Sequence, residues 1–220
     1  MSDFQNRTDA GQRLAARLIH LRDQAPVVLA LPRGGVAVGL EVARALRAPL
    51  DLVLVRKIGA PFQPELAIGA IADGGHIEAV FNPDLVELAP ETWIKEETAR
   101  QVKELERRRA VYLGHRPRVP IKGHTAILVD DGIATGATMR AALRAVRRED
   151  PKRLVLAVPV ASPDTVSDLM SEADEVVCLH TPSSLRAISL FYDDFRQLED
   201  ADVIRLLDEA ERLPGDDGQP

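Results

Sequence analysis

The chain holds one cysteine among its 220 residues, Cys178, and therefore can form neither an internal disulfide nor a cysteine zinc cluster. Aromatic residues are scarce at 4%, and no apolar run approaches the ~20 residues that a membrane-spanning helix needs. An excess of positive charge is lacking too: the formal net charge is −6, which argues against nonspecific nucleic-acid binding. The N-terminus is polar and does not resemble a signal peptide. We therefore expect a cytoplasmic protein that binds neither membranes nor nucleic acids.

Hydrophobic residues (45%) and charged residues (28%) occur in the proportions of an ordinary globular protein, and the length suits one substantial domain covering residues 1–220. Short apolar runs alternate with stretches of helical spacing, which predicts an α/β fold: a parallel sheet with helices on both faces. Strands are predicted at 27–31, 50–55, 125–129, 153–158 and 175–179. Helices are predicted at 9–22, 36–46, 91–112, from about 136, at 163–171 and at 200–211.

Residues 125–139 carry the most informative pattern. An apolar run ends at the adjacent acids Asp130 and Asp131, and a loop of small residues then leads into a helix. Backbone N–H groups at a helix N-terminus favour a phosphate, and small residues let it approach the backbone. Because like charges repel, the acids cannot serve that phosphate, but they can accept hydrogen bonds from sugar hydroxyls. The alternative, an ordinary strand–turn–helix with an acidic cap, needs neither the paired acids nor both Thr135 and Thr138.

A second strand–glycine turn–helix junction occurs at Pro32-Arg33-Gly34-Gly35, directly after strand 27–31. It too directs backbone amides toward an anion. The strand predicted at 50–55 leads into Arg56 and Lys57. Because the carboxyl ends of parallel strands lie at one edge of a sheet, this cation pair would face the same crevice as the two loops. A solvated basic strand end is the alternative for the pair.

The segment ILVDDGIATGAT, residues 127–138, and the PRGG segment together resemble the PRPP-binding signature and the pyrophosphate loop of the type I phosphoribosyltransferases. PRPP is phosphoribosyl pyrophosphate. The resemblance implies that Asp130 and Asp131 hold the ribose 2- and 3-hydroxyls. It assigns the 5-phosphate to a loop formed by Ala134, Thr135, Gly136, Ala137 and Thr138. It assigns the pyrophosphate to Arg33, Gly34, Gly35 and Lys57, with a cis peptide bond at Pro32–Arg33.

The resemblance also names the groups that would carry catalysis, which are Arg33, Lys57, Asp130 and Asp131. Mg²⁺ is the implied cofactor, carried mainly by PRPP oxygens and waters, and no dedicated protein metal ligands are expected. The partners would be PRPP, a small-molecule acceptor and a second copy of the chain in a homodimer.

The fold implied by the resemblance is a five-stranded parallel sheet of strand order 3-2-1-4-5, flanked by helices. The many glycines and prolines of residues 58–75 predict a long lid loop with a short hairpin through 68–71 and 76–80. Residues 90–115 are expected to form a helical excursion from the sheet. Residues 180–220 would form a small hood, with a disordered tail from residue 213.

The expected function is transfer of the phosphoribosyl group of PRPP to a nitrogenous base or similar nucleophile, with release of pyrophosphate. The alternative is a non-catalytic PRPP- or nucleotide-binding regulator, but the pyrophosphate loop, Lys57 and the lid favour an enzyme. A Rossmann dehydrogenase is excluded because neither glycine loop reads G-x-G-x-x-G. Hypoxanthine/guanine-type enzymes carry an aspartate where this chain has Ala134. We therefore expect adenine-like or non-purine acceptors, with Glu65 as the candidate acid to contact them.

Overall fold

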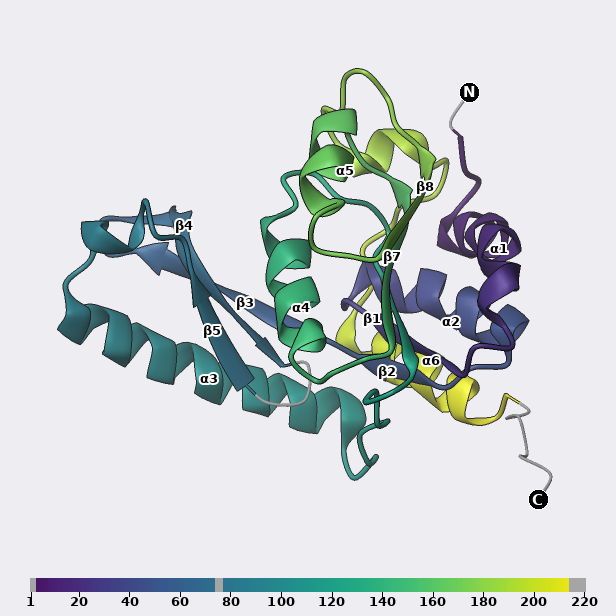
Figure 1. The fold of residues 1–220 in the computed structure, drawn as a ribbon, viewed down its shortest axis with the longest axis horizontal. Coiled ribbons are helices and arrows are strands. Elements are labelled where there is room, and N and C mark those ends of the chain that lie inside the picture. Colours follow the sequence, from purple (N-terminus) through teal and green to yellow (C-terminus); the bar gives the residue numbers. More distant parts are fainter. Residues whose placement is uncertain (1–2, 74–76, 214–220) are drawn as a thin grey trace.

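The computed structural model describes residues 3–73 and 77–213, which are organised around a five-stranded parallel sheet (Figure 1). In spatial order its strands are β2 (Leu50–Leu52), β1 (Pro26–Ala30), β6 (Thr125–Val129), β7 (Arg153–Val160) and β8 (Glu175–His180). The helices are α1 (Arg7–Leu18), α2 (Gly34–Leu46), α3 (Glu91–Leu113), α4 (Ala137–Arg147), α5 (Pro163–Leu169) and α6 (Asp200–Glu211). Short 3-10 turns are η1 (Ile19–Leu21), η2 (Val86–Leu88) and η3 (Ile188–Phe191). The predicted α/β class is confirmed.

Helices cover both faces of this sheet because successive strand residues point to opposite faces. On one face, α1 and α2 pack onto Val28 and Ile127; on the other, α4 and α5 pack in a cluster with Leu29 and Leu128. Every residue of β1 and β6 is buried. A sheet covered on both faces thus accounts for strands that are apolar throughout, without alternation.

The strand order differs in detail from the expected 3-2-1-4-5. Numbered along the chain, the five parallel strands stand in the order 2-1-3-4-5. After β2 the chain leaves this sheet, builds a second one, and returns to add β6 to the other side of β1. The direction in which strands are added therefore reverses between β1 and β6. In open α/β sheets, ligands bind at the carboxyl ends of the strands at this kind of reversal.

Residues 54–113 form an arm that projects to one side of the central sheet (Figure 1). The arm is an antiparallel sheet of β3 (Leu54–Ala60), β4 (Gln63–Asp73) and β5 (Ile77–Phe81), with α3 along one face. Ile58, Ile68 and Ile71 are fully buried in one cluster with Leu105 of α3. The same apolar cluster continues into α2 and α6, so the arm is packed against the rest of the molecule.

The arm corrects two predictions. Residues 58–60 and 63–73 are strand and do not form the expected lid loop, and the strand expected at 50–55 is divided between β2 and β3. Gly69 explains the first difference, because a Cβ there would come within 2.7 Å of Phe81 Cδ1; the glycine permits close strand packing and does not mark a turn. The pairing of β4 with β5 confirms the predicted hairpin, while its turn at residues 74–76 lies outside the described residues.

The N-terminus and the segment before α6 lie together. Helix α1 begins two residues before its predicted start because Asn6 Oδ1 accepts the N–H of Asp9 at 3.0 Å. Residues 181–199, which we call the hood segment, fold back so that Tyr192 packs on Phe4 with ring centroids 5.3 Å apart. Of the predicted disordered tail, residues 214–220 lie outside the described residues. Within the described parts of the chain, no helix has the length and apolarity required to cross a membrane.

Candidate active site

The two predicted loops meet at the carboxyl ends of β1 and β6. Asp130 and Asp131 follow β6, and the PRGG segment follows β1, its neighbour in the sheet. A Cβ on Gly35 would come within 2.7 Å of the Val129 carbonyl, and a Cβ on Gly34 would overlap the carboxylate of Asp131. The backbone of the glycine turn therefore lies directly against the acid pair, which only residues without side chains permit.

The PRGG segment has the expected cis peptide bond, but the side chain of Arg33 is directed toward the start of α6. The peptide bond between Pro32 and Arg33 is cis, as the resemblance implies. The guanidinium of Arg33 lies 3.5 Å from the carboxylate of Glu199, at the start of α6. Both side chains of this pair are substantially exposed. Exposed ion pairs contribute little, so the contact is readily exchanged for another anion.

The loop that leads into α4 is open to solvent at its tip and anchored at its base. Ala134, Thr135, Ala137 and Thr138 are exposed, while Gly136 takes a left-handed conformation with φ of 77°. At the base, Thr165 Oγ1 donates to the Ala134 carbonyl at 3.0 Å. No side chain caps the N-terminus of α4. Its first-turn N–H groups therefore remain available for an anion, as the sequence predicts.

The two acids differ in environment. Asp130 Oδ1 accepts the backbone N–H of Asp131 at 2.8 Å. Burial raises the pKa of Asp130 well above its ordinary value, and the negative charge of Asp131 raises this pKa further. Asp130 consequently keeps its proton to higher pH than an exposed aspartate does.

Three further residues join this site: two are aromatic residues of the hood segment, and the third, Arg7, was not indicated by the sequence. Arg7 of α1 places Nε 2.7 Å from Asp131 Oδ2, and its guanidinium carbon lies 3.8 Å from the centre of the Phe195 ring. The Tyr192 hydroxyl donates to the backbone carbonyl of Asp131 at 2.6 Å. Arg7 and Asp131 are 124 positions apart, and no local pattern links them. The folding of the hood segment against the N-terminus creates this part of the site.

The two cations after β2 point in opposite directions on β3. Arg56 donates to the side-chain oxygen of Gln101 in α3 at 3.0 Å, so it links β3 to α3 within the arm. Lys57 is exposed and lies on the same face of β3 as Val55, which packs against the α4 side of the core. This face is the one that looks away from α3. The role of Lys57 stays a prediction, and the side chain of Glu65 lies outside the described residues.

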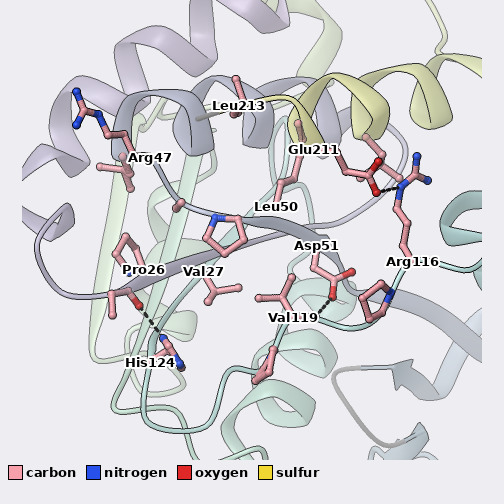
Figure 2. A pocket seen from close by; sticks show the side chains of 18 of the residues that line it. Pro26, Val27, Arg47, Leu50, Asp51, Arg116, Val119, His124, Glu211 and Leu213 are labelled. Carbon is pink, nitrogen blue, oxygen red and sulfur yellow. Dashed lines mark hydrogen bonds and ion pairs between the residues drawn. The ribbon is translucent and has the colours of Figure 1, made fainter. Parts of the chain in front are cut away.

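A cavity of about 920 Å³ opens elsewhere, at the edge of the sheet where β1 and β2 begin (Figure 2). None of the predicted site residues lines it. Some of its charged side chains have partners within the protein: the Asp51 carboxylate accepts the N–H groups of Leu52 at 2.7 Å and Val119 at 2.9 Å, and Arg116 pairs with Glu211. The cavity is therefore separate from the site at the acid pair.

The chain is similar in sequence and in structure to several known proteins. The family model described as "Phosphoribosyl transferase domain" matches residues 2–195. A "Putative phosphoribosyl transferase" from Mycobacterium tuberculosis is 46% identical over 217 residues, a match that covers 96% of this chain and 48% of that protein. The chain thus spans about half the length of the curated relatives it matches. The crystal structure of TT1426 from Thermus thermophilus is 47% identical, with a TM-score of 0.83, over 95% of this chain and 99% of that one.

Proposed function

The chain belongs to the phosphoribosyl transferase domain family, and from this premise we propose that it transfers the phosphoribosyl group of PRPP to a nitrogenous base or similar nucleophile, releasing pyrophosphate. The observation that supports the proposal best is the meeting of the acid pair, the PRGG turn and the open N-terminus of α4 at the reversal between β1 and β6. One compact ligand with a phosphate, a diol and a pyrophosphate could use all three.

Each segment suits one part of PRPP. The N-terminus of α4 offers amides to the 5-phosphate, with Thr135 and Thr138 exposed beside it. The acid pair accepts hydrogen bonds from the ribose hydroxyls. The amides of the PRGG turn meet the pyrophosphate, where Arg33 and Lys57 would neutralise the charge that develops as it departs. Fixing the ribose and the leaving group in this way places the carbon to be attacked in one orientation.

Mg²⁺ is part of the proposal, as the ion that helps to neutralise the pyrophosphate. The residues offer it few ligands of their own: among those that the structure describes, no three acidic, histidine or cysteine side chains gather into a cation site. At the acid pair, Asp131 is already paired with Arg7. We therefore assign the ion mainly to oxygens of PRPP and to waters, in keeping with the preference of Mg²⁺ for substrate phosphates.

The acceptor is constrained by Ala134. This residue is exposed at the loop and carries no group that can exchange a proton with a base. General acid–base help is typically worth about 10²–10⁴-fold. We therefore propose adenine-like or non-purine acceptors and expect hypoxanthine and guanine to be poor substrates. The expected homodimer and cytoplasmic location stay predictions.

Pyrophosphate release from PRPP, measured across a panel of bases and small nucleophiles, tests the proposal. An Ala134→Asp variant serves as the companion, because it restores an acid at this position and should improve the use of 6-oxopurines. Efficient turnover of guanine by the unaltered protein would contradict our interpretation of Ala134. PRPP binding without pyrophosphate release for any acceptor would favour the regulator.

A further inference from the structure

Arg7 belongs to the first turn of α1, and its side chain is 11% exposed. Burying a guanidinium is costly unless its donors are satisfied. Here Nε is paired with Asp131, and Nη1 donates to the Arg196 carbonyl at 2.9 Å. The guanidinium carbon lies over the ring of Phe195. Three separate contacts hold one side chain in a single place. The guanidinium is thereby fixed beside the carboxylate of Asp131, which we propose binds the ligand.

The N-terminal and hood segments form a frame around this contact. The N–H of Phe4 donates to the Phe191 carbonyl at 2.9 Å, and the N–H of Asp193 donates to the Phe4 carbonyl at 2.9 Å. From this frame, Tyr192 holds the main chain of Asp131, and Arg7 holds its side chain. The position of Asp131 is thus set by residues distant from it in the sequence.

Arg7 also supplies positive charge where two acids adjoin. Asp130 and Asp131 repel each other, and the positive charge of Arg7 opposes the rise in the pKa of Asp130. In this structure the neighbours just described do not supply that charge: Arg33 lies against Glu199, Tyr192 contributes a neutral hydroxyl, and the PRGG turn contributes backbone at its glycines. Without Arg7, the pair would hold a proton over a wider pH range.

We propose that Arg7 is a positioning residue of the PRPP site, which fixes the carboxylate of Asp131 and compensates the charge of the acid pair so that both acids can accept ribose hydroxyls. This inference rests on the proposed function, because the ribose gives the acid pair its task. Arg7 itself acts through Asp131 and needs no contact with the ligand.

Three variants separate this role from a merely structural one. Arg7→Met removes the charge and the hydrogen bonds but keeps an apolar chain over Phe195. Arg7→Lys keeps the charge. Arg13→Met is the matched control: Arg13 is on the same helix, lies over the Phe4 ring at 5.6 Å and pairs with Asp9 at 2.9 Å, with no described contact to the acid pair.

Two measurements are made on the full chain. Calorimetry of PRPP with Mg²⁺ across acid to weakly basic pH gives the affinity, and ¹³C NMR of the aspartate carboxyls, without ligand, follows the titration of the acid pair. We expect Arg7→Met to weaken PRPP binding near neutral pH by roughly 10- to 100-fold, as loss of a charge-assisted contact would. The loss should shrink as the pH rises, and the carboxyl titration should move to higher pH.

Arg7→Lys should leave the carboxyl titration near that of the unaltered protein, and Arg13→Met should change neither measurement. An equal loss of affinity at every pH with an unmoved titration would overturn the proposal, and so would full affinity in Arg7→Met. If the unaltered protein fails to bind PRPP, the proposed function falls. The NMR titration then still decides, by its shift or its absence, whether Arg7 controls the acid pair.

Discussion

Gly34 lies directly against the carboxylate of Asp131, and any side chain at position 34 would overlap it. The two residues come from different strand–turn–helix junctions, one after β1 and the other after β6. Their contact joins the PRGG turn to the acid pair, so that one ligand can reach both.

Gly34→Ala is expected to displace the Asp131 carboxylate and to weaken PRPP binding about tenfold or more, a loss of about 1.4 kcal/mol or more. Gly39→Ala is the control on the same helix, because its Cβ would meet the Ala30 Cβ at 3.1 Å in the core. The control should leave PRPP affinity unchanged, whichever way its melting temperature moves. Calorimetry and thermal unfolding of both variants check this, and undiminished PRPP affinity in Gly34→Ala would refute it.

Lys57→Ala is expected to lower kcat more than it weakens PRPP binding, because the charge on departing pyrophosphate grows in the transition state. Steady-state kinetics and calorimetry measure the two effects. Lys122→Ala, an exposed lysine 3.7 Å from Asp150, is the control and should change neither. Equal losses in kcat and affinity would identify Lys57 as a ground-state phosphate contact. No loss in either would make it a solvated strand residue.

Asp73 anchors the base of the arm. Its side chain is fully buried and pairs with Arg109 of α3 at 2.7 Å and with Arg118, which precedes β6. Asp73→Asn removes the negative charge that two partly exposed arginines share, and a hydrogen bond to a charged group is worth about 1.5–3 kcal/mol. Urea unfolding should report a loss of that order in the free energy of unfolding. Glu104→Gln, which breaks exposed pairs within α3, should have little effect, and a similar loss in both variants would contradict the assignment.

Asp130 is expected to reduce stability near neutral pH. Its pKa is raised by burial and by Asp131, so the folded chain binds this proton at pH values where the unfolded chain has released it. The free energy of unfolding therefore falls as pH rises through that interval. Asp130→Asn should accordingly raise the melting temperature at neutral pH, and the gain should vanish below the ordinary aspartate pKa.

Asp174, in contrast to Asp130, is expected to increase stability near neutral pH. Its hydrogen bonds with Arg147 lower its pKa, so its contribution to stability is present above the ordinary aspartate pKa and is lost as pH falls. Asp174→Asn should lower the melting temperature at neutral pH and have a weaker effect in acid. Thermal unfolding across pH checks both signs, and a destabilised Asp130→Asn at neutral pH would be inconsistent with the raised pKa.

The parts of the site that sequence reasoning found are those built from local patterns. The Asp130-Asp131 turn and the PRGG turn each lie within one strand–turn–helix junction, where the apolar run, the small residues and the helical spacing are adjacent in the chain. Their meeting followed from a general property of parallel sheets, which gather carboxyl ends at one edge. The continuous apolar runs of β1 and β6 likewise required only a sheet covered on both faces.

The parts that sequence reasoning missed depend on contacts between distant segments. In the sequence, Arg7 is one of several polar residues near the N-terminus. Its role becomes visible only in the fold, where the hood segment contacts it. In the sequence, Gly69 suggests a loop. In the fold it lies in a strand, where its lack of a side chain leaves room for Phe81 of the neighbouring strand. The strand order depended on which side of β1 the chain would rejoin after the arm, and no residue of β6 encodes that choice locally.

The most direct test of the account is calorimetric titration of PRPP with Mg²⁺ into the unaltered protein and into the double variant Asp130→Asn/Asp131→Asn. Each lost charge-assisted hydrogen bond is worth about 1.5–3 kcal/mol, so the double variant should lose most of its PRPP affinity. Thermal unfolding of the same samples serves to check that the variant is folded. Saturable binding to the unaltered protein with a large loss in the variant is the predicted result; equal affinity in the two would contradict the assignment of the acid pair to the ribose.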